Sequence, residues 1–184
     1  MSGLSTSITL CLDSNAEAVA RALSAGDTAV LDQHLEHGLL ITSSRNNYLE
    51  YSVSRLIAHF NVGSLGHLTR NFKSGRPAQG WSATALHDPR PIGQSLRHLL
   101  TLLREKSSET IATLDNVHIS EQEWAMLQDQ PRSISEAVAR FDDARARNEG
   151  DDPATIFAFL QAHLVLIEHA ASNADACVYA CYMY

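Results

Sequence analysis

The fold of this chain is decided by residues 152–171, which read DPATIFAFLQAHLVLIEHAA. Asp152 and Pro153 stand in the order typical of a helix start, a capping side chain followed by a proline whose missing N–H is not needed there. The residues that follow, from Ala154 to about Ala171, are apolar nearly all round the expected helix. A helix of this kind has no face suited to water. We therefore expect it to be the central and most buried helix.

The same stretch is not predicted to cross a membrane. Between residues 156 and 171 it is interrupted by four polar side chains, Gln161, His163, Glu168 and His169. It also falls short of the roughly 20 apolar residues that a bilayer requires.

Short motifs on either side of this stretch predict further helices. Three Ser-x-x-Glu capping boxes, in which the hydroxyl and the carboxylate satisfy backbone N–H groups of the first turn, begin at Ser14, Ser120 and Ser133. Apolar residues at spacings of three, four and seven predict helices over residues 53–60 and 96–103. Helix signals are therefore spread along most of the chain.

Strand signals are few. Residues 39–42, Leu-Leu-Ile-Thr, form one short β-prone run, and alternation of apolar and polar residues is nearly absent elsewhere. We therefore predict an all-α fold, a single compact helical array or bundle of about seven or eight helices. The expected divisions are an uncharged, flexible or leader-like N-terminus (1–13) and one helical domain (14–184), with helix pairs and a basic loop (14–106) followed by an acidic helical half (107–184).

Residues 73–93, KSGRPAQGWSATALHDPRPIG, are predicted to form a long loop. They hold three of the five prolines, and Pro89 and Pro91 argue against an ordinary helix there. A loop of this length inside a compact domain is either functional or mobile.

The charge changes sign along the chain. Residues 45–106 carry nine Lys or Arg against three acidic residues, a net +6, whereas residues 1–44 carry a net −4 and residues 107–184 a net −9. A basic segment in an acidic protein either meets an anionic ligand or neutralises the protein's own acidic parts. The overall net charge of −7 argues against general nucleic-acid binding, which depends on neutralising phosphates.

Within the basic segment, the central loop supplies the candidate binding residues. Arg70, Lys73 and Arg76, next to glycine backbone, are suited to hold a phosphate or a carboxylate. Trp81 lies beside them and is suited to anchor a partner protein. The alternative is that the loop faces the protein's own acidic helices and that Trp81 covers the core.

Residues that could carry chemistry are scattered. An odd number of cysteines, three, favours a reducing compartment such as the cytoplasm. The nine histidines do not form a zinc-binding motif such as His-Glu-x-x-His, so we expect no metal and no other cofactor. The enzymatic alternative is a small transferase or hydrolase acting on a phosphate-bearing or peptide substrate, with Cys11 as nucleophile and His87 and Asp88 as its partners. Whether these three meet is not evident from the sequence.

Two stretches resemble ankyrin repeats. Residues 22–38, ALSAGDTAVLDQHLEHG, are similar to the family pattern A-A-x-x-G-H-x-x-V-V-x-x-L-L-x-x-G, and Thr84–His87 with Gly93 resembles its T-P-L-H…G signature. The resemblance covers at most residues 14–105, and the glycine spacings differ from the 33 residues of that family. It implies stacked helix pairs that present a protein-binding surface. The exposed fingers would include Asn46, Asn47 and Tyr48.

The first twelve residues, MSGLSTSITLCL, carry no charge and are rich in Ser and Thr, and in this they resemble the leader of bacterial type III secreted effectors. The alternatives for this segment are a frayed terminus or a first strand. Together these observations predict a protein-interaction module that binds another protein through its basic central loop. We expect it in the cytoplasm, or exported by a bacterial secretion system into a host cell.

Overall fold

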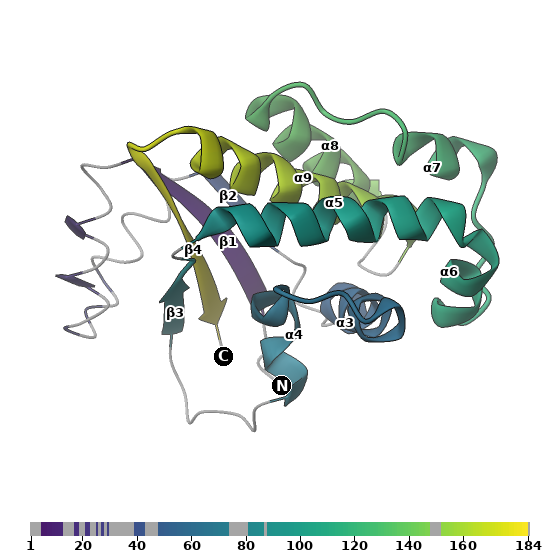
Figure 1. The fold of residues 1–184 in the computed structure, drawn as a ribbon, viewed down its shortest axis with the longest axis horizontal. Helices are drawn as coiled ribbons and strands as arrows, with labels where there is room; N and C mark the ends of the chain where they lie inside the picture. Colours follow the sequence, from purple (N-terminus) through teal and green to yellow (C-terminus); the bar gives the residue numbers. More distant parts are fainter. Residues whose placement is uncertain are drawn as a thin grey trace.

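A computed structural model of the chain (Figure 1) combines an antiparallel sheet with a layer of helices. Apart from single positions between residues 17 and 29, the residues that it describes are 5–12, 39–42, 48–73, 81–86, 88–147 and 152–183.

The sheet has the strand order β2-β1-β4-β3, and every neighbouring pair is antiparallel. Its strands are β1 (Ser5–Leu12), β2 (Leu39–Thr42), β3 (Trp81–Ala85) and β4 (Ala176–Met183). The two middle strands come from opposite ends of the chain and pair from Ser5 opposite Met183 to Leu12 opposite Ala176. Their pairing therefore brings the two ends of the chain together.

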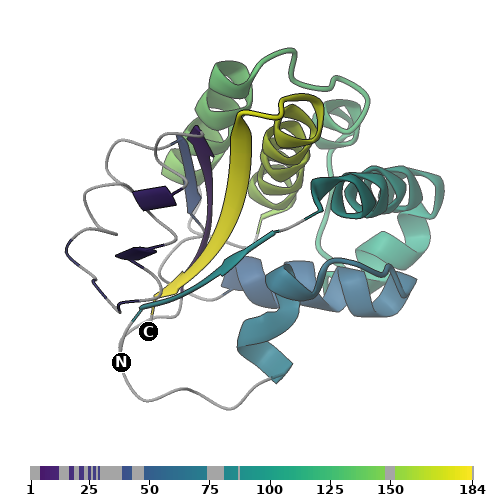
Figure 2. The same ribbon diagram turned by 60° about the vertical axis from the view of Figure 1, so that its left-hand side comes forward.

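The described residues between 48 and 172 form seven helices, which confirms the predicted helical array. They are α3 (Tyr48–Phe60), α4 (Gly66–Lys73), α5 (Pro89–Glu105), α6 (Ser107–Thr113), α7 (Glu121–Met126), α8 (Ile134–Arg147) and α9 (Pro153–Ser172). Figure 2 shows α9 lying directly against the sheet, with α5 beside it.

The central position predicted for α9 is confirmed. Fourteen of its twenty residues are buried, and it packs against α5, α7, α8 and three strands of the sheet. By length and composition alone α9 could also cross a membrane, but 72% of its most apolar window is buried inside the structure. The core helix of a soluble protein meets the same criterion.

The sheet is the main feature that the sequence did not predict, apart from residues 39–42, and it corrects the expectation of a chain with almost no strand. In β1, Ile8, Leu10 and Leu12 alternate with polar residues and cysteine, and this segment agrees with a first strand, one of the alternatives to a leader. β4 is apolar at every position, so it has no alternation to recognise. The all-α description therefore holds for the helical layer, and a four-stranded sheet accompanies it.

The predicted loop over residues 73–93 is wrong at two places. Residues 81–85 form β3, and α5 begins at Pro89. Pro89 and Pro91 are tolerated because the first N–H groups of a helix have no partner within it, and Asp88 caps this start by accepting a hydrogen bond from the Arg90 N–H (3.2 Å). Residues 74–80 lie outside the described residues.

The helix starts predicted from capping residues are confirmed where the structure describes them. Ser120 and Glu123 form a reciprocal capping box at α7. The Asp152 carboxylate accepts a hydrogen bond of 2.9 Å from the Thr155 N–H at the start of α9. Ser14 and most of residues 22–38 lie outside the described residues, so the ankyrin resemblance stays a prediction. Of its second stretch, Thr84 lies in β3 and Gly93 inside α5.

Candidate functional site

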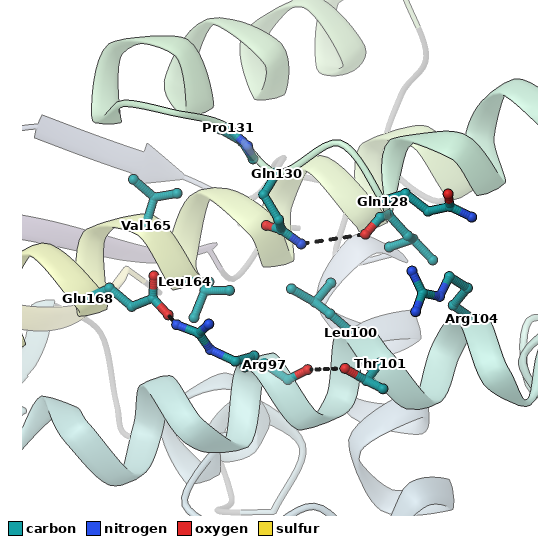
Figure 3. Close-up of a pocket in the computed structure, with 11 residues that line it drawn as sticks. Arg97, Leu100, Thr101, Arg104, Gln128, Gln130, Pro131, Leu164, Val165 and Glu168 are labelled. Carbon is teal, nitrogen blue, oxygen red and sulfur yellow. Dashed lines mark hydrogen bonds and ion pairs between the residues drawn. The ribbon is translucent and has the colours of Figure 1, made fainter.

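A cavity of about 320 Å³ lies between α5, α9 and the connection from α7 to α8 (Figure 3). This volume is at the small end of the range usual for ligand pockets. The cavity is lined by both apolar and charged side chains, so it offers a ligand apolar surface and polar groups that can orient it.

One wall of the cavity comes from α5. The apolar residues of this helix, which include Leu96, Leu100 and Leu103, are buried, and most of them face α9 and its neighbours. Arg97 and Arg104 border this buried stripe and are seven residues apart, so they lie two helical turns from each other on nearly the same face. Figure 3 shows the two arginines at opposite ends of the cavity, with Leu100 between them.

The two arginines differ in their partners. Arg97 forms an ion pair with Glu168 of α9, which also lines the cavity. Arg104 is exposed and makes no ion pair with any residue in the described part of the chain. The Arg97 guanidinium is therefore already bound to a carboxylate of the protein, whereas the Arg104 guanidinium can donate hydrogen bonds to a carboxylate of a ligand.

The floor of the cavity is apolar. Leu100, Leu127 and Leu164 are each at most 5% exposed, and the half-buried Val165 extends this surface along α9. These side chains offer water no hydrogen bonds. An aliphatic side chain of a ligand would bind there favourably, because its contact with the leucines removes apolar surface from water.

The wall opposite α5 is the connection from α7 to α8, which contributes Gln128, Gln130 and Pro131. Arg140 of α8 holds this connection in place. Its guanidinium donates to the carbonyl of Asp129 at 2.6 Å and to the carboxylate of the same residue at 3.0 Å. The amide groups of the two glutamines are thus held on a backbone that is tied to α8.

Glu136 of α8 also helps to hold the α7–α8 connection. Its carboxylate accepts hydrogen bonds from the Arg132 N–H (2.7 Å) and from the Arg140 guanidinium (2.5 Å). These bonds lower the pKa of Glu136, the backbone bond from Arg132 having the largest effect. The carboxylate therefore stays ionised well below neutral pH.

The binding residues predicted from the sequence lie elsewhere. Arg70 and Lys73 belong to α4, Trp81 is the first residue of β3, and Tyr48 is the first residue of α3. Only their backbone positions are described. Three further predicted residues lie outside the described part of the chain, Asn46, Asn47 and Arg76.

The Cys11–His87–Asp88 alternative receives no support from the described residues. Cys11 lies in β1, opposite Cys177 of β4, and His87 is outside the described part of the chain. Asp88 is exposed and accepts hydrogen bonds from the side chain and the backbone N–H of Arg90, which lower the pKa of its carboxyl. This carboxylate is therefore engaged in capping α5.

Two buried histidines, His67 of α4 and His163 of α9, form a second polar feature of the interior. The Nδ1 of His163 donates a 2.7 Å hydrogen bond to the Phe159 carbonyl, while its Nε2 is buried without a hydrogen-bond partner among the described residues. Burial lowers the pKa of His163 to about 3 and that of His67 to about 4, so both rings are neutral at pH 7. Within the described part of the chain, no three metal-ligating side chains come together.

Sequence reasoning counted Arg97 and Arg104 in the basic segment but did not select them. The usable signal was their spacing of seven residues directly beside a leucine stripe of the same helix. The other two walls of the cavity come from segments 20 to 70 residues further along the chain, and no local pattern connects them with α5.

A scan against protein-family models gave no match, and searches of the curated proteins and of the solved structures also found no match.

Proposed function

We propose that this chain is a protein-interaction module that binds an acidic segment of a partner protein in the cavity between α5, α9 and the α7–α8 connection. The observation that carries the proposal is Arg104, an arginine at an apolar-floored cavity that has no acidic partner among the described residues. A guanidinium and a carboxylate form two parallel charge-assisted hydrogen bonds.

The other lining residues fit the same kind of ligand. The leucine floor accommodates one aliphatic side chain, and the amides of Gln128 and Gln130 can bond to peptide groups. The volume of about 320 Å³ suits a few residues of a peptide rather than a folded surface. A short segment with acidic and aliphatic residues therefore matches the cavity in charge, polarity and size.

The proposal keeps the basic middle of the chain as the binding region but shifts the contact to α5. The Lys73–Arg76 loop remains a second candidate for an anionic ligand, and it lies mostly outside the described residues. A cytoplasmic setting, or export into a host cell, remains part of the proposal, resting on the cysteine count and the uncharged N-terminal residues.

A titration of the ¹⁵N-labelled protein with the peptide Ac-Glu-Leu-Glu-Leu-Glu-NH₂ tests this function. We expect the amide signals of residues 97–104 and 127–130 to shift, and Arg104→Gln to weaken binding about tenfold or more because it removes the charge-assisted bonds. Arg90→Gln is the matched control, because Arg90 is an exposed arginine of the same helix that does not line the cavity.

The same peptide with lysine in place of glutamate should not bind. The proposal is wrong if millimolar acidic peptide shifts no signal at the cavity, or if Arg104→Gln and Arg90→Gln bind the peptide equally well.

A further inference from the structure

We infer that Glu168 is an internal competitor for the ligand, and that the preferred ligand carries two carboxylates about 10 Å apart, one for Arg104 and one that displaces Glu168 from Arg97. This inference rests on the proposed function, because it concerns the same cavity. It starts from the different states of the two arginines, one paired within the protein and one not paired with any described residue.

The ion pair of Arg97 and Glu168 lies at the surface, where it can be broken at little cost in stability. Its side chains are 70% and 39% exposed, so water reaches both partners. Exposed ion pairs contribute little to stability because solvent screens them and because holding two long side chains together costs entropy. A ligand carboxylate can therefore take the place of Glu168 without disturbing the core.

The distance between the two arginines defines the spacing of the ligand's charges. Seven residues of α-helix, at 1.5 Å each, separate Arg97 from Arg104 by about 10 Å along α5. In a polyproline II segment, residues three apart lie on the same side and about 9 Å from each other. In an extended strand, residues on the same side are about 7 or 13 Å apart, so neither spacing matches the two arginines as well.

We therefore expect the cavity to prefer a peptide in polyproline II conformation in which two residues separate two acidic residues. The probe is Ac-Glu-Pro-Pro-Glu-NH₂, in which the prolines favour that conformation. Ac-Glu-Glu-Pro-Pro-NH₂ has the same composition and charge but the wrong spacing, so it is the matched control peptide.

The decisive variant is Glu168→Gln, which keeps the shape of the side chain and removes its charge. We expect it to bind Ac-Glu-Pro-Pro-Glu-NH₂ at least threefold more tightly than the unmodified protein, measured by titration calorimetry or by ¹⁵N chemical shifts. Removing any negative charge weakens general repulsion of an acidic peptide. Glu105→Gln controls for this, since Glu105 is exposed at the end of α5, next to Arg104, and does not line the cavity.

The tighter peptide binding of Glu168→Gln should also depend on Arg97. The double variant Arg97→Gln, Glu168→Gln should lose the tighter binding, because the arginine that Glu168 released is then missing. Circular dichroism confirms that each variant is folded before the titration.

The possible outcomes separate the two claims. Binding that depends on Arg104 but is not tightened by Glu168→Gln, or is tightened equally by Glu105→Gln, overturns the competitor role and leaves the proposed function standing. Equal affinity for both proline peptides overturns the spacing. Absence of binding by every variant overturns the proposed function and this inference with it.

Discussion

His163 lies in the middle of α9 with no exposed surface, and His67 of α4 is 9% exposed. Burial lowers the pKa of both rings from the ordinary 6.5, to about 3 for His163 and to about 4 for His67. The unfolded chain therefore binds protons that the folded chain excludes. The stability that the neutral rings contribute is fully present above pH 6.5 and is lost as the pH falls toward 3 to 4.

As the pH falls from 6.5 to 5, we expect the free energy of unfolding to decrease with a slope that rises from about 0.7 to about 1.4 kcal/mol per pH unit for each of these histidines, because the unfolded imidazoles are half protonated at pH 6.5 and almost fully protonated at pH 5. The substitution His163→Asn should remove about half of this dependence, because the amide can still donate to the Phe159 carbonyl but does not titrate. Urea unfolding at a series of pH values measures the slope. His118→Asn, at an exposed position, is the control, and an unchanged slope in His163→Asn would contradict the prediction.

At the scale of the elements, the position of the connection from α7 to α8 depends on Arg140 of α8. Arg140 bonds to the backbone and the side chain of Asp129 and to Glu136, and its side chain is 26% exposed. We expect Arg140→Met, which keeps the aliphatic stem, to lower the free energy of unfolding by about 1–2 kcal/mol. It should also speed hydrogen exchange at residues 128–130 of the cavity wall.

Arg147→Met is the matched control for Arg140→Met. Arg147 is also an arginine of α8, but its guanidinium donates to the Asp143 carbonyl of the same helix. Exchange rates at residues 128–130 that are the same in both variants would show that Arg140 does not hold the connection.

The elements also differ in how far the sequence predicts them. α9 and the capping boxes are recognised because their signals lie within a few neighbouring residues. β1 and β4 are not, because what defines them is pairing between opposite ends of the chain. The cavity has the same difficulty. Arg97 and Arg104 are visible as charges in the sequence, but only the packing of α5 on α9 brings them to an apolar floor.

At the scale of the whole molecule, the antiparallel pairing of β1 with β4 has the largest sequence separation among the strand pairs of the described residues. Ser5 pairs with Met183, and β4 also pairs with β3, so the sheet closes only when both ends of the chain are in place. Contacts between distant residues slow folding, because a long loop must close before they form.

A circular permutant tests this dependence on the chain ends. Residue 184 is joined to residue 1 by a short Gly/Ser linker, and the chain is opened between Asp115 and Asn116, an exposed turn with φ values of 59° and 60°. The opening places the ion pair of Asp115 with Arg55 at a new chain end, and because the Asp115 side chain is 78% exposed we expect little change in stability. Stopped-flow refolding should be faster than for the parent chain, because β1 and β4 become neighbours in sequence.

A second permutant, opened inside α9 between Gln161 and Ala162, is the control and should not fold, because that helix is buried at the centre of the core. If the first permutant refolds no faster than the parent, the pairing of the two chain ends does not limit folding. The formation of the helical layer around α9 would then be the slow step, since it is the other part of the fold that joins distant segments.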